Sequence, residues 1–203
     1  MEPLEYGNYY HIYNHAVGNR DLFYEPANYQ YFLGLYDKYI LPIADTYAWV
    51  LMKNHFHLLV RMKAKEEMTD CLHLTGFKNL SGVENIKPLH QYFSNLFNAY
   101  TKAFNKRYET NGTLFERPFK RKIINDESYL KKVILYIHKN PVHHGFCEHP
   151  IEYPWSSYLT CISMKPTNLR RTEVIGWFDD EANFKYMHSS KMEIKETENW
   201  LEM

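Results

Sequence analysis

The chain has 203 residues, and its 24 basic and 24 acidic side chains give a formal net charge of zero at pH 7. This balance argues against a simple polyanion binder, and no apolar run approaches the ~18 residues that cross a bilayer. The length fits one core-bearing domain with an appended segment, which we place at residues 1–160 and 161–203.

The sequence pattern predicts strands and helices that alternate along the chain. In order, the expected elements are a strand at Tyr9–Asn14, a helix at Ala27–Ile40, strands at Thr46–Met52 and His55–Met62, a short helix around Thr69–Leu72, a long helix at Leu89–Tyr108, a strand at Phe119–Ile124, and a helix that starts at Asp126 or Ser128 and stops after Asn140, before Pro141. The pair Lys53-Asn54 is expected to turn a hairpin between the second and third strands.

The order strand, helix, hairpin, helix, strand is typical of an antiparallel sheet backed by helices. We therefore expect an α+β fold of the ferredoxin-like type, with a helical C-terminal extension. The extension can pack against the domain as small helices or contact a partner.

Two histidines stand two residues apart in the third strand. His55 and His57 project from one face of that strand, because residues i and i+2 share a face, while Phe56 and Leu58 point into a core. Neighbouring neutral imidazoles can chelate a divalent metal. The alternative is that both are half-exposed strand histidines, because a His-x-His motif alone is a weak signal.

The last predicted helix places a phenol next to an amide. Tyr136 and Asn140 are four residues apart, so they share one helix face. The phenol could act as a nucleophile and the amide oxygen could ligate a metal. The alternative is that Tyr136 is a core aromatic, one of 18 tyrosines in the chain, and that Asn140 is simply the last residue of a helix.

Positive charge gathers near this helix although the whole chain is neutral. Residues 101–122 contain seven basic and two acidic side chains, a balance of +5, whereas residues 173–203 have a balance of −5. A basic stripe of this kind can hold phosphates. The alternative is a solvated helix face followed by an ordinary edge strand.

Four blocks in this order and spacing resemble the HUH single-strand DNA transposases, specifically the REP-associated tyrosine transposase group, over about residues 9–160. The blocks are Trp49–Val60, Gly112–Lys120, Tyr129–Val142 and Tyr153–Tyr158. The resemblance implies that residues 1–160 are a catalytic domain that cleaves and rejoins hairpin-flanked DNA through a 5′-phosphotyrosine.

The resemblance also implies roles for individual residues. Tyr136 would be the nucleophile, and His55, His57 and Asn140 would hold a divalent metal, Mg²⁺ or Mn²⁺; imidazoles alone would favour later transition metals. The expected partner is single-stranded or hairpin DNA. The residues expected to bind it are Arg117, Lys120, Arg121, Lys122 and His15.

The chain departs from the family at two points. It has His15-Ala16 where the family often has Arg-Gly, and His143-His144 where the family often has Arg-Ala. Both points are expected DNA contacts, so the target sequence stays open. A protein that binds hairpin DNA or RNA without cutting it is the alternative function. We favour a monomer that uses Tyr136 in cis, while related enzymes that exchange the tyrosine helix make a dimer the alternative.

Location can also be predicted. The stretch Met1–Glu5 lacks the basic and apolar pattern of a signal peptide. Cys71, Cys147 and Cys161 are far apart and form no Cys-x-x-Cys pair, which indicates reduced thiols. We therefore expect a cytoplasmic protein without a membrane partner.

Overall fold

A computed structural model describes residues 3–68 and 87–190 of the chain. Four strands form one antiparallel sheet in the order β2-β3-β1-β4. They are β1 (Tyr9–His15), β2 (Ala44–Leu51), β3 (His55–Met62) and β4 (Lys120–Ile124). With α1 (Pro26–Tyr39) after β1 and α3 (Leu89–Tyr108) after β3, the connections are those of a ferredoxin-like unit, and the predicted fold class is confirmed.

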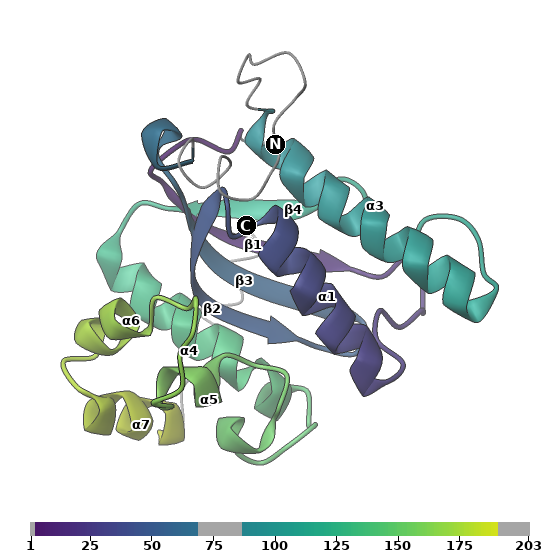
Figure 1. Ribbon diagram of the computed structural model, residues 1–203. Helices are drawn as coiled ribbons and strands as arrows, with labels where there is room; N and C mark the ends of the chain where they lie inside the picture. The colour runs from purple at the N-terminus through teal and green to yellow at the C-terminus, as the bar shows by residue number, and fades with distance from the viewer. Residues whose placement is uncertain (1–2, 69–86, 191–203) are drawn as a thin grey trace.

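Helices α1 and α3 lie side by side over one face of the sheet (Figure 1). Strand alternation sends Tyr10, Ile12, Phe56 and Leu58 into this layer, where all four are buried in one hydrophobic core. Aromatic rings from the helices fill the space between the layers; Phe32 of α1, for example, lies 5.5 Å from Phe56 between ring centroids. This core anchors β3 and therefore fixes which face its histidines present.

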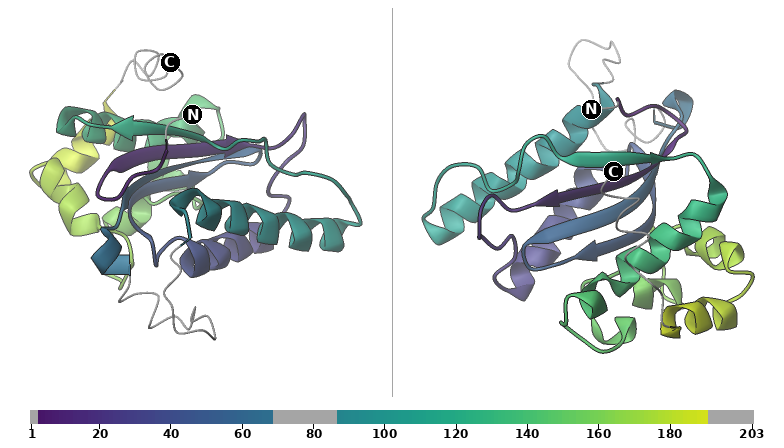
Figure 2. Two further views of the ribbon diagram at one scale, coloured as in Figure 1. Left: turned by 90° about the horizontal axis from the view of Figure 1, so that it is seen from above. Right: turned by 180° about the vertical axis from the view of Figure 1, so that it is seen from behind.

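Helix α4 (Glu127–His143) crosses the opposite face of the sheet (Figure 2). The remaining described elements follow it and pack around it. They are η1 (Pro150–Glu152), α5 (Tyr158–Cys161), α6 (Arg171–Trp177) and α7 (Glu181–Ser189). Val174, Phe178 and Phe184 of this C-terminal region are fully buried in a second core shared with β2 and α4. The small helices of the extension thus help to hold α4 against the sheet.

The predicted end of α4 at Asn140 is wrong, because the helix runs through Pro141 to His143. A proline this close to the end of a helix removes only one backbone donor. The last turn is still held by the His144 N–H, which donates to the Asn140 carbonyl at 3.0 Å. At the start, Asp126 is the cap, and its carboxylate accepts from the Ser128 N–H at 2.8 Å.

Other boundaries differ less from the prediction. Strand β3 and helix α3 have the predicted bounds, and Met52 N–H donates to His55 O across the predicted hairpin at 2.7 Å. Strand β2 begins two residues earlier than predicted, at Ala44. The short helix expected at Thr69–Leu72 lies outside the described residues. Within the described ranges, no helix is long and apolar enough to cross a membrane.

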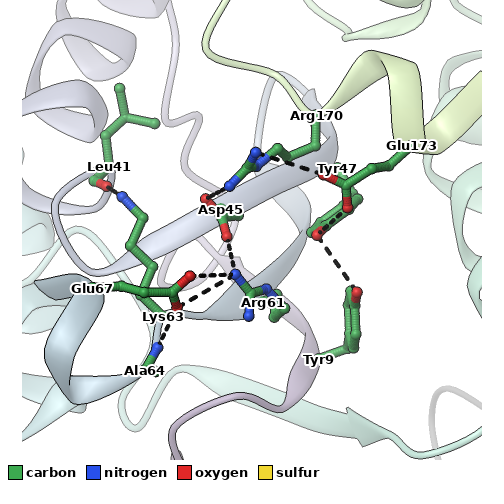
Figure 3. Close-up of polar contacts among 10 residues, drawn as sticks. All are labelled: Tyr9, Leu41, Asp45, Tyr47, Arg61, Lys63, Ala64, Glu67, Arg170 and Glu173. Carbon is green, nitrogen blue, oxygen red and sulfur yellow. Dashed lines mark hydrogen bonds and ion pairs between the residues drawn. The ribbon is translucent and has the colours of Figure 1, made fainter.

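A network of charges connects the extension to the sheet edge (Figure 3). The buried Asp45 carboxylate on β2 accepts from Arg61 of β3 at 2.6 Å and from Arg170, next to α6, at 3.0 Å. The Tyr47 hydroxyl donates to the Glu173 carboxylate at 2.9 Å. Because Asp45 is buried, its charge is compensated by both guanidinium groups rather than by water.

A chain of buried hydrogen bonds connects α7 to α4. His188 Nδ1 donates to the Phe184 carbonyl at 2.7 Å, so its Nε2 accepts from His138 Nδ1 at 2.9 Å. His138 Nε2 then accepts from the Ser157 hydroxyl at 2.7 Å, while that hydroxyl accepts the Trp49 N–H at 2.8 Å. Each ring nitrogen has one defined role, and α4 is therefore fixed against both β2 and α7.

Candidate active site

The two strand histidines lie on the face of the sheet that α4 covers. Both side chains are 4% exposed, and their ring centroids are 5.1 Å apart. Phe56 between them points the other way, into the first core. The alternative that His55 and His57 are half-exposed is therefore wrong, and the buried pair faces the helix that carries Tyr136.

Helix α4 brings Asn140 to both imidazoles. Asn140 Oδ1 is 3.1 Å from His55 Nε2, and Asn140 Nδ2 is 3.5 Å from His57 Nε2. The amide is itself only 1% exposed. Three side chains predicted to share a metal thus converge at one buried point between β3 and the last turns of α4.

Tyr136 lies one helical turn before Asn140, against the same strand. Its ring stands edge-on to His57, with centroids 5.3 Å apart and planes at 86°. It contacts His11 of β1 in the same way, at 5.9 Å. The side chain is half-buried, so the phenol is neither sealed in the core nor free in solvent. The nucleophile candidate and the candidate ligands therefore share one face.

The hydrogen bond of His55 leaves a lone pair pointing into the site. Asn54 Oδ1 lies 2.8 Å from His55 Nδ1 and can only accept, so Nδ1 carries the hydrogen and Nε2 carries a lone pair. That lone pair faces Asn140 Oδ1, which is also an acceptor. Two acceptors at hydrogen-bond distance repel unless a cation lies beside them. The donor set of two nitrogens and one oxygen fits a divalent metal.

Burial keeps these imidazoles neutral. Desolvation lowers the pKa of His55 to about 4, while the nearby Asn140 oxygen, which favours the charged imidazolium, raises that pKa and so opposes the shift. Desolvation also lowers the pKa of His57 well below its usual value, and the nearby His11 lowers it further. Only a neutral imidazole has the lone pair that a metal ion needs. In residues 3–68 and 87–190, no cluster of three His, Cys, Asp or Glu side chains could hold a metal, so the third ligand here would be the amide of Asn140.

His15 and His144 lie at the rim of this site. The His15 ring stacks on His55 at 4.8 Å, and the His144 ring meets His55 edge-on at 5.2 Å. Both positions belong to the two pairs, His15-Ala16 and His143-His144, that depart from the pattern of the transposase group that the sequence resembles. Their contact with His55 places two further imidazoles beside the candidate ligands.

The predicted basic stripe is divided between the two faces of β4. Lys122 and Lys120 stand opposite His11 and Tyr13 of β1 in the sheet register, so they share the face of the candidate site. Lys120 Nζ lies 5.9 Å from the centroid of the Tyr13 ring. The two lysines therefore flank the candidate site along the strand at the sheet edge.

Arg121 and Arg117 lie on the other side. Arg121 stands opposite the core residue Ile12, and Arg117 donates to Asn98 of α3 at 3.0 Å. Together they line a groove of about 630 Å³ between α3 and residues 113–121. The four cations are not one continuous surface, because strand alternation separates Arg121 from its two lysine neighbours.

His11 is a site residue that the sequence prediction missed. Its Nε2 is 3.0 Å from His57 Nδ1, and it contacts Tyr136. A signal was present, since His11, Tyr13 and His15 alternate in one strand in the way that singled out His55 and His57. That His11 lies beside His57 depends on the pairing of β1 with β3.

Comparison with known proteins agrees with the fold. The chain is similar to a solved structure described as the REP-associated tyrosine transposase bound to a REP hairpin, with a TM-score of 0.60 and 15% sequence identity over 82% of this chain and 86% of the other. Searches against protein-family models and against curated proteins found no match. The similarity agrees with the predicted fold class, an α+β fold built on a four-stranded antiparallel sheet.

Proposed function

We propose that the chain is a metal-dependent endonuclease and transposase that cleaves and rejoins single-stranded, hairpin-flanked DNA. The observation that carries this proposal is the meeting of Tyr136 with His55, His57 and Asn140 on one face of the sheet. Such a set joins a nucleophile with two neutral nitrogens and an amide oxygen. The solved transposase of the same fold, which is bound to a hairpin, supports the same class of substrate.

The chemistry follows from the groups present. A phosphodiester resists attack because its anionic oxygens repel nucleophiles, and a divalent metal bound by His55, His57 and Asn140 would withdraw that charge. Mg²⁺ or Mn²⁺ is the cofactor we propose.

Tyr136 then performs the cleavage. Its phenol oxygen forms a bond to phosphorus while the bond from phosphorus to the 3′ oxygen breaks, and the phenol proton reaches the departing 3′ oxygen through solvent. The products are a 5′-phosphotyrosine and a free 3′-hydroxyl. Since one phosphate ester replaces another, a new 3′-hydroxyl can reverse the step and join a different strand.

The contacts of α4 support use of Tyr136 within its own chain. His138 and Lys139 lie between Tyr136 and Asn140 in α4. His138 hydrogen-bonds to His188, and Lys139 donates to the Ser190 carbonyl, both in the C-terminal region. Both residues are buried by this packing. A helix held in this way by the extension favours a monomer over an exchange of helices between two copies.

The test is a cleavage assay on labelled oligonucleotides. The substrates are inverted repeats from the DNA beside the gene, made as hairpins with a single-stranded flank and as perfect duplexes. We expect cleavage of the flanked hairpin with Mg²⁺ or Mn²⁺, none with a chelator, and none with Tyr136→Phe. Tyr129→Phe is the matched control on the same helix and should cleave. Tight binding of the hairpin without cleavage in the presence of any divalent metal would contradict the proposal. It would favour the alternative function, a protein that binds hairpins without cutting them.

A further inference from the structure

In the described part of the chain, the His11 side chain has one hydrogen-bond partner, and that partner is a candidate metal ligand. Its ring is 1% exposed and nearly parallel to that of His57, with an interplanar angle of 9°. The atoms that meet are His11 Nε2 and His57 Nδ1, 3.0 Å apart. One hydrogen lies between these two nitrogens. Which nitrogen it is bonded to determines whether His57 Nε2 has a lone pair for a metal.

The contacts of His57 Nε2 indicate which of the two nitrogens, His57 Nδ1 or His11 Nε2, carries the hydrogen. If His57 Nδ1 carries the hydrogen, its Nε2 has a lone pair directed at the Asn140 amide, from which Asn140 Nδ2 can donate at 3.5 Å. If His11 Nε2 carries it instead, His57 Nε2 must be protonated and would face that same amide N–H. With Asn140 Oδ1 directed at His55 and Nδ2 directed at His57, the first arrangement pairs the His57 lone pair with a donor, whereas the second sets two donors against each other.

With the hydrogen on His57 Nδ1, His11 is left with a buried N–H that has no acceptor among residues 3–68 and 87–190. With Nε2 accepting, its hydrogen lies on Nδ1, and that atom is the one buried side-chain nitrogen or oxygen in the described residues without a hydrogen-bond partner. A buried unpaired donor destabilises the folded state. An apolar residue could fill a core position without that cost, so the presence of histidine here calls for a role that an apolar residue cannot perform.

We propose that His11 is a positioning residue, which accepts the Nδ1 hydrogen of His57 and thereby presents the bare Nε2 of His57 to the metal. The inference rests on the proposed metal role of His57. Ligating histidines commonly donate their second nitrogen to a fixed acceptor, which sets the ring orientation and tautomer. His55 has the corresponding contact to Asn54. Each candidate histidine ligand then has its own acceptor, Asn54 in the β2–β3 turn for His55 and His11 on β1 for His57.

The first measurement needs no variant. Nitrogen-15 chemical shifts of histidine side chains in the metal-free protein at neutral pH report which ring nitrogen carries the hydrogen. We expect His57 and His55 as Nδ1–H tautomers and His11 also as Nδ1–H. A His57 ring protonated at Nε2 would overturn the role of His11.

Two variants then separate positioning from packing. His11→Gln can offer a side-chain oxygen near the place of Nε2, whereas His11→Leu fills a similar volume without an acceptor. Binding of Mn²⁺, measured by titration calorimetry, should weaken by about 10- to 100-fold in His11→Leu and by only a few-fold in His11→Gln. The nitrogen-15 signature of His57 should change in His11→Leu alone.

The results distinguish this inference from the proposed function. If His55→Ala abolishes Mn²⁺ binding while both His11 variants bind as the wild type does, the metal site stands and the role of His11 is overturned. If the wild-type protein binds no Mn²⁺, the metal role fails and the inference about His11 fails with it. If Mn²⁺ binding weakens equally in the Gln and Leu variants and their melting temperatures are similar, His11 affects the site only through packing. That result would also overturn the proposal.

Discussion

Asn140 Oδ1 lies 3.1 Å from His55 Nε2, although 85 positions separate the two residues in the chain. Helix α4 must cross the sheet at one depth and one rotation for this contact to form. The first core fixes β3 from one side, and the packing of the C-terminal helices fixes α4 from the other. The candidate site is therefore a product of both layers.

Replacing Asn140 tests its place in the proposed metal site. Asn140→Asp puts a carboxylate oxygen in the same position and should tighten Mn²⁺ binding, since a hard cation prefers an anionic oxygen. Asn140→Leu removes the oxygen and should weaken binding at least tenfold. Titration calorimetry with both variants checks this. Equal affinities in the two would place the third ligand elsewhere.

The division of the basic residues predicts unequal effects on DNA binding. Neutralising Lys120 and Lys122, which share the face of Tyr136, should lower the log-log salt slope for a flanked hairpin by about 1.4 to 1.8, because each phosphate contact contributes about 0.7 to 0.9. Arg117→Ala with Arg121→Ala removes the same charge from the groove side and should change the slope less. Fluorescence anisotropy over a salt series measures both slopes. A larger loss from the arginine pair would route the DNA along the groove beside α3.

The wild-type protein should also prefer a flanked hairpin to the matching duplex. Tyr136 lies half-buried against the sheet, and a stacked duplex denies it an exposed, deformable backbone. Competition of the two DNA forms in the same anisotropy assay measures the preference. Equal affinity would mean that binding does not involve the single-stranded flank.

The charge network at the sheet edge predicts a loss of stability. Asp45→Ala removes the buried carboxylate that two partly exposed guanidinium groups share and should lower the free energy of unfolding by about 2 kcal/mol. Glu67→Ala is the matched control, because Glu67 binds Arg61 from an exposed position and should cost under about 1 kcal/mol. Urea denaturation measures both values. Similar losses in the two variants would mean that burial of Asp45 does not matter.

The anchoring of α7 predicts a pH dependence. Burial, the largest cause, lowers the pKa of His188 to about 4, and its neighbours His138 and Lys139 are also buried. In the unfolded chain the pKa is ordinary, about 6.5, so the unfolded state takes up the proton first as the pH falls. The contribution of neutral His188 to stability is therefore complete above about pH 6.5 and is lost as the pH falls towards 4.

His188→Gln tests this dependence. Between about pH 6.5 and 4 the free energy of unfolding should fall less steeply in the variant, by up to about 1.4 kcal/mol per pH unit. Urea denaturation at half-unit steps supplies the slopes. Parallel curves for the two proteins would assign the pH dependence to other groups.

Much of this arrangement could be predicted from local sequence patterns. The i and i+2 spacing of His55 and His57 in a strand, and the i and i+4 spacing of Tyr136 and Asn140 in a helix, gave the correct faces because each depends only on its own element. The bounds of β3 and α3 could be predicted for the same reason.

What could not be predicted depends on contacts between elements. The place of His11 follows from the register of β1 against β3, which a single sequence does not contain. The continuation of α4 past Pro141 follows from hydrogen bonds with the residues beyond it. The division of the basic residues differs from these two cases, because strand alternation alone places Arg121 on the face opposite to Lys120 and Lys122.

The central claim is that Tyr136 attacks DNA. The measurement that tests it most directly is mass spectrometry of the wild-type protein after incubation with a flanked hairpin and Mn²⁺. We expect a 5′-phosphonucleotide on the peptide that contains Tyr136, and no adduct in Tyr136→Phe, which should still bind the hairpin almost as tightly. An adduct on the Phe variant, or a wild-type adduct that maps to Tyr129, would contradict it.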